Sequence, residues 1–161
     1  MLVEVQALVG ETAQGSPRRT SIGVDGQRVA MILAVLERRL GFGLAARDVF
    51  VNLAGGINVA EPATDLAVAA AIVGSAMDRP IAGEQVLVGE IGLTGEIRNV
   101  GRLPERLREA ARLGFERALV PAAGLEPEDE RECGLTVRGV DRLDQMLGLL
   151  FPEEAGGSPL R

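Results

Sequence analysis

The segment 64–77 (TDLAVAAAIVGSAM) constrains the fold more than any other part of this sequence of 161 residues. Its residues are apolar nearly all round a helix, and many of them are Ala. A helix without a polar face must be buried, and small side chains let neighbouring backbones approach it closely. The rest of the chain must therefore supply layers that enclose this helix.

The segments around it alternate between strand and helix patterns. A helix is predicted for Gly26–Leu40, because apolar residues recur at i, i+3, i+4, i+7 and i+11 from Val29. Asp25 is placed to cap this helix and Gly41 to end it. Another helix, with Pro104 in its first turn, runs from about Leu103 to Gly114, and a final one covers 141–150. Strands are predicted at 2–9, 18–24, 48–53, 86–89, 95–100, 118–121 and 135–140, and a charged loop at 125–133.

This order of elements predicts an α/β (α+β) fold, with a mixed sheet packed on helices. No internal linker is long enough to separate two domains, so one domain is expected over 1–151. Residues 152–161 (PEEAGGSPLR) are expected to form a disordered tail.

Missing residue types exclude whole classes of catalysis. All 17 basic residues are Arg, and the chain has no His, Tyr or Trp and a single Cys, Cys133. Without His or Lys there is no Ser-His-Asp triad, Cys-His pair, Ser-Lys dyad or Schiff base. A phosphate-binding loop lacks its Lys, and a Cys/His zinc site cannot be assembled from one Cys. Chemistry that uses only carboxylates and oxygen-ligand sites for magnesium or calcium is not excluded, but we expect neither catalytic residues nor a metal site in this chain.

The charge is unevenly distributed along the chain. The formal net charge is −6, and residues 126–161 hold nine acidic residues against four Arg. This balance argues against a dedicated nucleic-acid-binding protein but leaves room for a basic patch upstream. The longest apolar run, 66–73, falls far short of the roughly 20 residues that span a bilayer, so no membrane partner is expected. The sequence thus predicts a soluble protein.

Four motifs occur in an order that resembles a known family. They are EVQALV, SPRRTSIGVDGQRVAMILAVLERRLG, DVFVNLAGGINVAEPATDLAVAAAI and VGEIGLTGEIRNVGRLPERLREAARLGF. The order is similar to that of the C-terminal domain of bacterial RadA (Sms) proteins, which belong to the Lon protease-like domain superfamily. The resemblance covers residues 2–150 and implies a Lon-like fold. The Lon-like domains of magnesium-chelatase-type ATPases share the strand–helix order, but match less well around SPRRTSIG and EPATDLA.

Within the wider Lon family, a Ser-Lys dyad performs proteolysis. An ungapped alignment on Gly89-Glu90-Ile91 places the serine position at Ala63 and the lysine position at Arg106. An alignment shifted by one residue would put the hydroxyl of Thr64 there, but the base would still be missing because Arg stays protonated. The resemblance therefore implies a domain without proteolytic activity.

The family also implies partners. RadA proteins act in homologous recombination and DNA repair, where a hexameric ring uses ATP to drive branch migration with a recombinase. Their zinc-binding motif and RecA-like ATPase core are absent from this sequence, so ATP, magnesium and zinc are expected only in N-terminal parts that it lacks. Expected partners are DNA, other copies of the chain in a hexamer, the recombinase and the ATPase core, in the cytoplasm at the nucleoid.

Six arginines are candidate contacts to the DNA phosphate backbone, because guanidinium groups match phosphate oxygens. They are Arg18, Arg19, Arg28, Arg98, Arg102 and Arg106. Each has a structural alternative: an interface ion pair, helix-end stabilisation as for Arg38 and Arg39, or salt bridges to the interleaved Glu105 and Glu109. With no Tyr or Trp and only four Phe, binding should be salt-sensitive and weak in sequence preference.

Acidic side chains near these positions are interpreted as structural. Glu61, Thr64 and Asp65 are expected to cap the following helix. Glu90 and Glu96 are expected to shape the bend between two strands, and Cys133 to be incidental.

Two other functions remain open at this point. One is an active peptidase that uses Thr64, against which the missing Lys counts. The other is an oligomerisation scaffold without DNA affinity, which the net charge of −6 favours.

Overall fold

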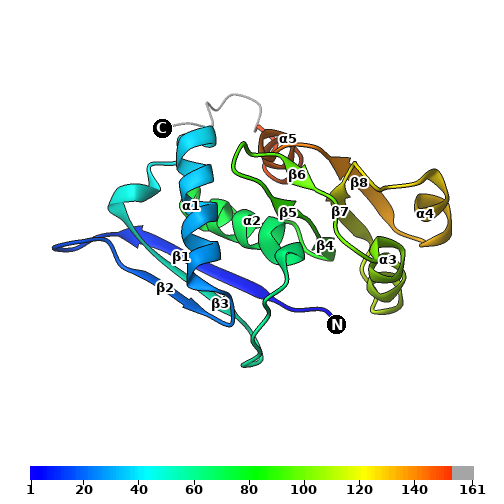
Figure 1. The fold of residues 1–161 in the computed structure, drawn as a ribbon, viewed down its shortest axis with the longest axis horizontal. Coiled ribbons are helices and arrows are strands. Elements are labelled where there is room, and N and C mark those ends of the chain that lie inside the picture. Colours follow the sequence, from blue (N-terminus) through cyan, green and yellow to red (C-terminus); the bar gives the residue numbers. More distant parts are fainter. Residues whose placement is uncertain (154–161) are drawn as a thin grey trace.

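The computed structural model describes residues 1–153 and contains two three-stranded sheets and a two-stranded hairpin (Figure 1). The predicted disordered tail, 152–161, lies almost entirely outside the described residues. The strands are β1 (Val5–Glu11), β2 (Arg19–Ile22), β3 (Arg47–Leu53), β4 (Gln85–Leu87), β5 (Glu90–Ile91), β6 (Ile97–Arg98), β7 (Arg117–Pro121) and β8 (Thr136–Val140). The helices are α1 (Gly26–Leu40), α2 (Asp65–Ala76), α3 (Leu103–Arg112), α4 (Pro127–Glu132) and α5 (Leu143–Leu150), with short 3-10 turns η1 (Leu44–Ala46) and η2 (Pro62–Thr64).

The first sheet has the order β1-β3-β2 and is mixed. β1 pairs antiparallel with β3, whereas β2 pairs parallel with it. Side chains alternate between the two faces of a strand. The face that carries Val9, Val49 and Val51 is therefore buried under α1 and α2, while the face that carries Leu8 and Ile22 is open to solvent.

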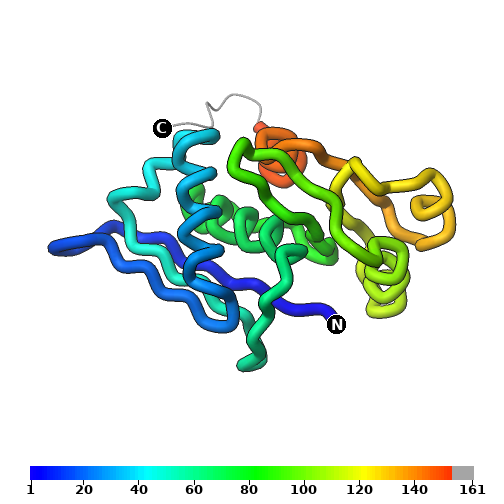
Figure 2. Tube along the Cα trace, in the orientation of Figure 1, coloured from blue at the N-terminus to red at the C-terminus, as the bar shows by residue number. Residues whose placement is uncertain are grey.

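The helix α2 forms the centre of the molecule, as the sequence predicts. It is buried on all sides, with Leu66, Val68 and Ile72 fully inaccessible. A methyl group on Gly74 would meet the carbonyl oxygen of Arg79 at 3.0 Å, which shows how closely the backbone packs there. In Figure 2, α2 lies between α1 and the second sheet. Because α2 is enclosed from both sides, it joins the two sheets through one core.

Helix α1 has the bounds and the caps that the sequence predicts. The Asp25 carboxylate accepts a hydrogen bond from the Gln27 N–H at 3.1 Å. The last turn ends at Gly41, which adopts a left-handed conformation (φ 69°) and donates its N–H to the Glu37 carbonyl oxygen. The predictions of both the periodicity and the capping residues are confirmed.

The second sheet, β4-β7-β8, is entirely parallel and has helices on both faces. Ala118 and Val120 point to α3, where they form a second cluster with Leu103, Leu107 and Ala110. Leu119 points to the opposite side and joins the main core with Val140 and Met146. The mixture of strands and helices confirms the predicted class, but the strands form two principal sheets, a division that the sequence did not indicate.

Two local predictions are wrong or inexact. The predicted loop 125–133 contains α4, which begins at Pro127 and has a capping box formed by Glu126 and Asp129. Its side chains are mostly charged, so it shows no apolar periodicity. The strands predicted at 86–89 and 95–100 are shorter, because the chain bends into the β5–β6 hairpin.

No helix within residues 1–153 is long and apolar enough to cross a membrane.

Candidate functional site

The two positions matched to the Lon dyad lie in one region. Gly89 donates its N–H to the Ala63 carbonyl oxygen at 2.9 Å, which fixes η2 against the segment before β5. The guanidinium of Arg106 reaches across from α3 to form an ion pair with Glu61, two residues before Ala63. A second hydrogen bond, from Arg106 Nε to the Gly101 carbonyl oxygen at 2.8 Å, holds this side chain. A buried methyl group and a protonated guanidinium offer neither a nucleophile nor a base.

Helix capping by Glu61, Thr64 and Asp65 is not observed, so that prediction is wrong. The Thr64 hydroxyl donates to the Glu61 carbonyl oxygen at 2.9 Å and makes no capping bond to α2. Asp65 turns instead toward α1 and accepts a hydrogen bond from Arg28 Nε at 2.7 Å. The local sequence favoured a cap, but Asp65 binds Arg28 instead, which lies 37 residues away in sequence.

Asp65 is the centre of a chain of ion pairs. Its side chain is only 1% exposed, and it also accepts the Ile91 N–H at 3.0 Å. Its hydrogen bond raises the pKa of the Arg28 guanidinium above its ordinary value, against the opposing effect of burial. Arg28 further approaches Glu90 at 3.8 Å, and Glu90 approaches Arg98 at the same distance. The chain connects the starts of α1 and α2 to the β5–β6 hairpin.

Glu96 closes the turn between β5 and β6, as expected of a structural residue. Its carboxylate accepts hydrogen bonds from the hydroxyl and the N–H of Thr94 and from Arg98. A methyl group on Gly92 would overlap the Glu96 carboxylate, so a larger residue there would displace that side chain from the turn. The Thr94 hydroxyl, followed by other hydrogen bonds that include Arg98, lowers the pKa of Glu96 from the usual 4.5 to about 2.

This shift predicts a pH dependence of stability. Because the pKa of Glu96 is lower in the folded state, its contribution is present above about pH 4.5 and is lost as the pH falls toward 2. In urea unfolding series, Glu96→Gln should therefore be less stable than the parent chain at pH 7. The difference should shrink as the pH approaches 2, and a constant difference would contradict the prediction.

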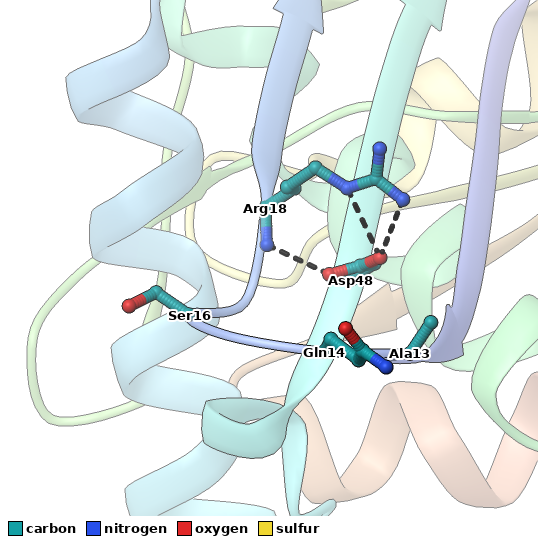
Figure 3. A pocket seen from close by; sticks show the side chains of 5 residues that line it. All are labelled: Ala13, Gln14, Ser16, Arg18 and Asp48. Carbon is teal, nitrogen blue, oxygen red and sulfur yellow. Dashed lines mark hydrogen bonds and ion pairs between the residues drawn. The ribbon is translucent and has the colours of Figure 1, made fainter.

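Arg18 directly precedes β2 and lines an open hollow of about 420 Å³ (Figure 3), and Arg19 is the first residue of that strand. Ala13, Gln14 and Ser16 of the preceding loop line this hollow together with Arg18 and Asp48. The Arg18 Nε and Nη2 atoms donate to one oxygen of Asp48 at 3.3 and 3.2 Å, and its backbone N–H donates to the other oxygen. That backbone bond, together with the Thr12 hydroxyl and the guanidinium, lowers the pKa of Asp48.

The guanidinium of Arg19 has a different environment. It donates to the carbonyl oxygens of Leu44 and Arg47, which carry no formal charge. Within residues 1–153 it has no carboxylate within 4 Å, so its charge is free to attract an anion.

The six predicted DNA contacts do not form one patch. Arg28 and Arg98 belong to the ion-pair chain around Asp65. Arg102 precedes α3 in a left-handed conformation and faces Glu105 at 3.8 Å. Figure 1 shows α3 and the loop between β1 and β2 at opposite ends of the molecule. Arg18 and Arg19 are thus separated from the set near α3.

Further exposed arginines of the described chain have no carboxylate within 4 Å. Arg38 and Arg39, at the end of α1, were interpreted from sequence as helix-end stabilisation, and they do occupy its last turn. The others are Arg108, Arg112, Arg117, Arg131 and Arg138. Within the same residues, no group of three or more Cys, Asp or Glu side chains is arranged to hold a metal ion.

The fold and this region define an α/β domain with two sheets around a buried helix, in which the positions matched to the Lon dyad hold Ala and Arg. A family model described as "Subunit ChlI of Mg-chelatase" matches residues 10–124, and the chain belongs to that family. The match includes the segments 16–23 and 61–67, where a poorer fit to the magnesium-chelatase branch is expected from the sequence.

The curated relatives are named for DNA repair and not for magnesium chelatase. The chain is 48% identical over 151 residues to "DNA repair protein RadA" of Pseudomonas aeruginosa, which covers 94% of this chain and 33% of the relative. It is 43% identical over 147 residues to the protein of that name from Bacillus subtilis, covering 91% and 32%. The Escherichia coli protein is 46% identical over 149 residues, covering 92% and 32%. The chain therefore spans about a third of the length of these relatives.

Proposed function

We propose that this chain is a non-proteolytic, Lon-like domain of a RadA-type protein that acts in DNA repair and homologous recombination. Identity of 43–48% over more than nine-tenths of the chain to proteins named for DNA repair carries this proposal. Its role would be to support a hexameric ring and to contact the DNA backbone during branch migration. ATP, magnesium, zinc and the recombinase would be bound by the remaining two-thirds of such a protein, at the nucleoid of the cytoplasm.

The absence of peptidase activity follows from the chemistry of the dyad region. Ala63 has no nucleophilic atom, and the guanidinium of Arg106 is held by Glu61. Thr64 donates its hydroxyl proton to a carbonyl oxygen, and the sequence contains no Lys that could remove that proton. Peptide hydrolysis that disappears in Thr64→Ala would contradict this part of the proposal.

For the DNA contact, Arg18 and Arg19 are the best-placed pair. They are adjacent and exposed, Arg18 borders a hollow, and Arg19 lacks a carboxylate partner in the described chain. Contacts of this kind neutralise phosphates and release counterions, so the affinity should fall with salt by about 0.9 log units per log unit for each duplex phosphate.

The test is fluorescence anisotropy with labelled duplex and single-stranded DNA across a salt series. We expect Arg18→Ala with Arg19→Ala to flatten the salt slope by about one unit for each phosphate that is no longer neutralised. The matched control is Arg38→Ala with Arg39→Ala, which removes the same charge from an exposed adjacent pair at the end of α1. Equal flattening in the control would assign the effect to net charge and contradict a local site.

The alternative function is a scaffold without DNA affinity, which the net charge of −6 supports. Sedimentation velocity without DNA tests the assembly. A ring in sedimentation, combined with no DNA binding at low salt, would replace the proposed DNA contact with the scaffold alone.

A further inference from the structure

A second hollow, of about 240 Å³, opens on the face of the second sheet that α5 partly covers, where the three strands begin. We call it the arginine hollow. Its lining combines four polar or charged strand residues with leucines, and includes Gln85, Arg117, Thr136, Arg138, Leu119 and Leu149. Sites for small molecules usually have volumes of roughly 300–1,000 Å³. The arginine hollow is smaller, so it suits a few side chains of a protein partner better than a free ligand.

The two arginines of this hollow share one face of the sheet. In the parallel pairing of β7 with β8, Arg117 lies beside Thr136. Two residues further along, Leu119 lies beside Arg138. Alternate residues of a strand point to the same face, so both guanidiniums lie on the side of Leu119, which packs into the main core near α5. From the usual spacing and rise of strands, the two Arg Cα atoms are about 8 Å apart. Both side chains can therefore reach one partner.

Neither guanidinium is neutralised within residues 1–153. Arg117 Nη2 donates to the Gly83 carbonyl oxygen at 3.1 Å, and this acceptor carries no formal charge. Arg117 and Arg138 are exposed, and among the described residues neither has a carboxylate within 4 Å. Leu149, which is 47% exposed, adds an apolar surface beside these charges. The hollow is therefore complementary to a protein surface that carries carboxylates.

The helix α4 presents such a surface on the same chain. It has no buried residue, and its three glutamates after Pro127 are all exposed. In the part of the chain that the structure describes, none of the three lies within 4 Å of an Arg nitrogen. Glu128 and Glu132 are four residues apart, so they share one face of the helix, with about 5–6 Å between their Cβ atoms. Each of these two carboxylates can therefore meet one guanidinium of the arginine hollow.

Within one molecule these two surfaces cannot meet. The order β4-β7-β8 advances in one direction, so right-handed crossovers put α3 and α4 on the same face of this parallel sheet. Leu125 and Cys133, which flank α4, accordingly belong to the cluster that contains Leu107 of α3. Figure 1 shows α4 at the end of the molecule beyond β8, away from α5. The α4 carboxylates can thus reach the arginine hollow only in another copy of the chain.

We infer that the arginine hollow binds α4 of a second copy of the chain, with Arg117 and Arg138 paired to Glu128 and Glu132. The two surfaces differ and lie on opposite faces of one sheet, so the contact is head-to-tail and each copy can make it twice. Contacts of this kind generate a ring when the rotation between copies closes. The inference rests on the ring in the proposed function and names the surfaces that join its subunits.

A DNA phosphate is the other anion that two guanidiniums could bind. The remaining lining of the hollow favours carboxylates of a protein. It contains Leu119 and Leu149 but no aromatic side chain on which a base could stack. The unpaired glutamates of α4 supply the matching charge within the same sequence.

Charge reversal on each side of the contact tests it, with self-association measured by sedimentation velocity over a range of protein concentrations. Arg117→Glu with Arg138→Glu should weaken association about hundredfold, because like charges that face each other across an interface are strongly unfavourable. Glu128→Arg with Glu132→Arg should have the same effect. All four substitutions in one chain make the facing charges opposite again and should restore assembly. An equimolar mixture of the two double variants should restore it too, with the variants alternating.

The matched control is Arg38→Glu with Arg39→Glu. It reverses the same charge on an exposed adjacent pair at the end of α1, outside both surfaces, and should assemble as the parent chain does. Circular dichroism and urea unfolding would confirm that all variants fold, as expected for exposed positions outside the capping box of α4.

The outcomes separate this inference from the proposed function. If the parent assembles and both double variants assemble equally well, this contact is wrong and the ring stands. If the combined variant does not regain the assembly that the double variants lose, α4 is not the partner and the inference is overturned. If Arg117→Glu with Arg138→Glu keeps assembly but lowers the affinity for DNA in anisotropy, the hollow takes phosphate and the inference is again overturned. If the parent stays monomeric, the ring and this contact both fail, whereas the DNA contact is measured separately.

Discussion

Replacement of Asp65 by Ala is expected to lower the free energy of unfolding by about 3–5 kcal/mol, the range found when one partner of a buried ion pair is removed. The Asp65 carboxylate is almost completely buried and accepts hydrogen bonds from Arg28 and from the Ile91 N–H. Without it, a guanidinium and a backbone N–H lose their acceptor. Because a quarter of the Arg28 side chain is exposed, water can solvate part of its charge, so the lower end of the range is expected.

Two further variants distinguish lost pairing from lost volume. Asp65→Asn keeps the shape and an acceptor for Ile91, and should cost less than Asp65→Ala. The double variant Arg28→Met with Asp65→Leu removes both charges and should be more stable than Asp65→Ala alone, since no unpaired charge stays buried. Urea unfolding at pH 7 measures all three. A loss below about 1 kcal/mol in Asp65→Ala, or a double variant that is less stable than Asp65→Ala, would contradict the pairing argument.

The elements with an apolar period could be predicted from the sequence, because burial itself generates that period. The bounds of α1 match the prediction to the residue, and the all-round apolar pattern of 64–77 indicated the central position of α2. The helix α4 lacks such a face, and only its Pro127 and its capping box mark its start. The division into two sheets depends on which strands pair with one another. No local sequence pattern indicates which strands form pairs.

For the candidate site, residue type could be predicted but pairing could not. The sequence singled out Arg28 and Asp65 separately, one as a DNA contact and the other as a cap. Nothing local shows that they bind each other, because they lie 37 residues apart. Phe50 is a different case. The alternation in 48–53 places it opposite the buried Val49 and Val51, so its outward position could have been read from the sequence.

Replacement of Gly23 by Ala should lower the free energy of unfolding by about 3 kcal/mol, the sum of a conformational and a packing cost. Gly23 joins β2 to α1 with φ at 82°, a conformation that costs an L-residue roughly 1–2 kcal/mol. A methyl group there would lie 2.5 Å from the Ile57 carbonyl oxygen and 2.8 Å from the Leu53 Cβ atom. Relieving such overpacking costs about another 1–3 kcal/mol. It would also disturb the hydrogen bond from the Val59 N–H to the Gly23 carbonyl oxygen, at 2.8 Å.

Gly15 provides the matched control for this substitution. Its φ of 81° is nearly the same, but a methyl group on it would meet no atom within 4 Å. Gly15→Ala therefore carries only the conformational cost, about 1–2 kcal/mol. The difference between the two variants, measured by urea unfolding, isolates the packing of Gly23 against the segment around Ile57. Equal losses would mean that this segment moves freely away from β2, and that the bridge between Val24 and Val59 does not hold it in place.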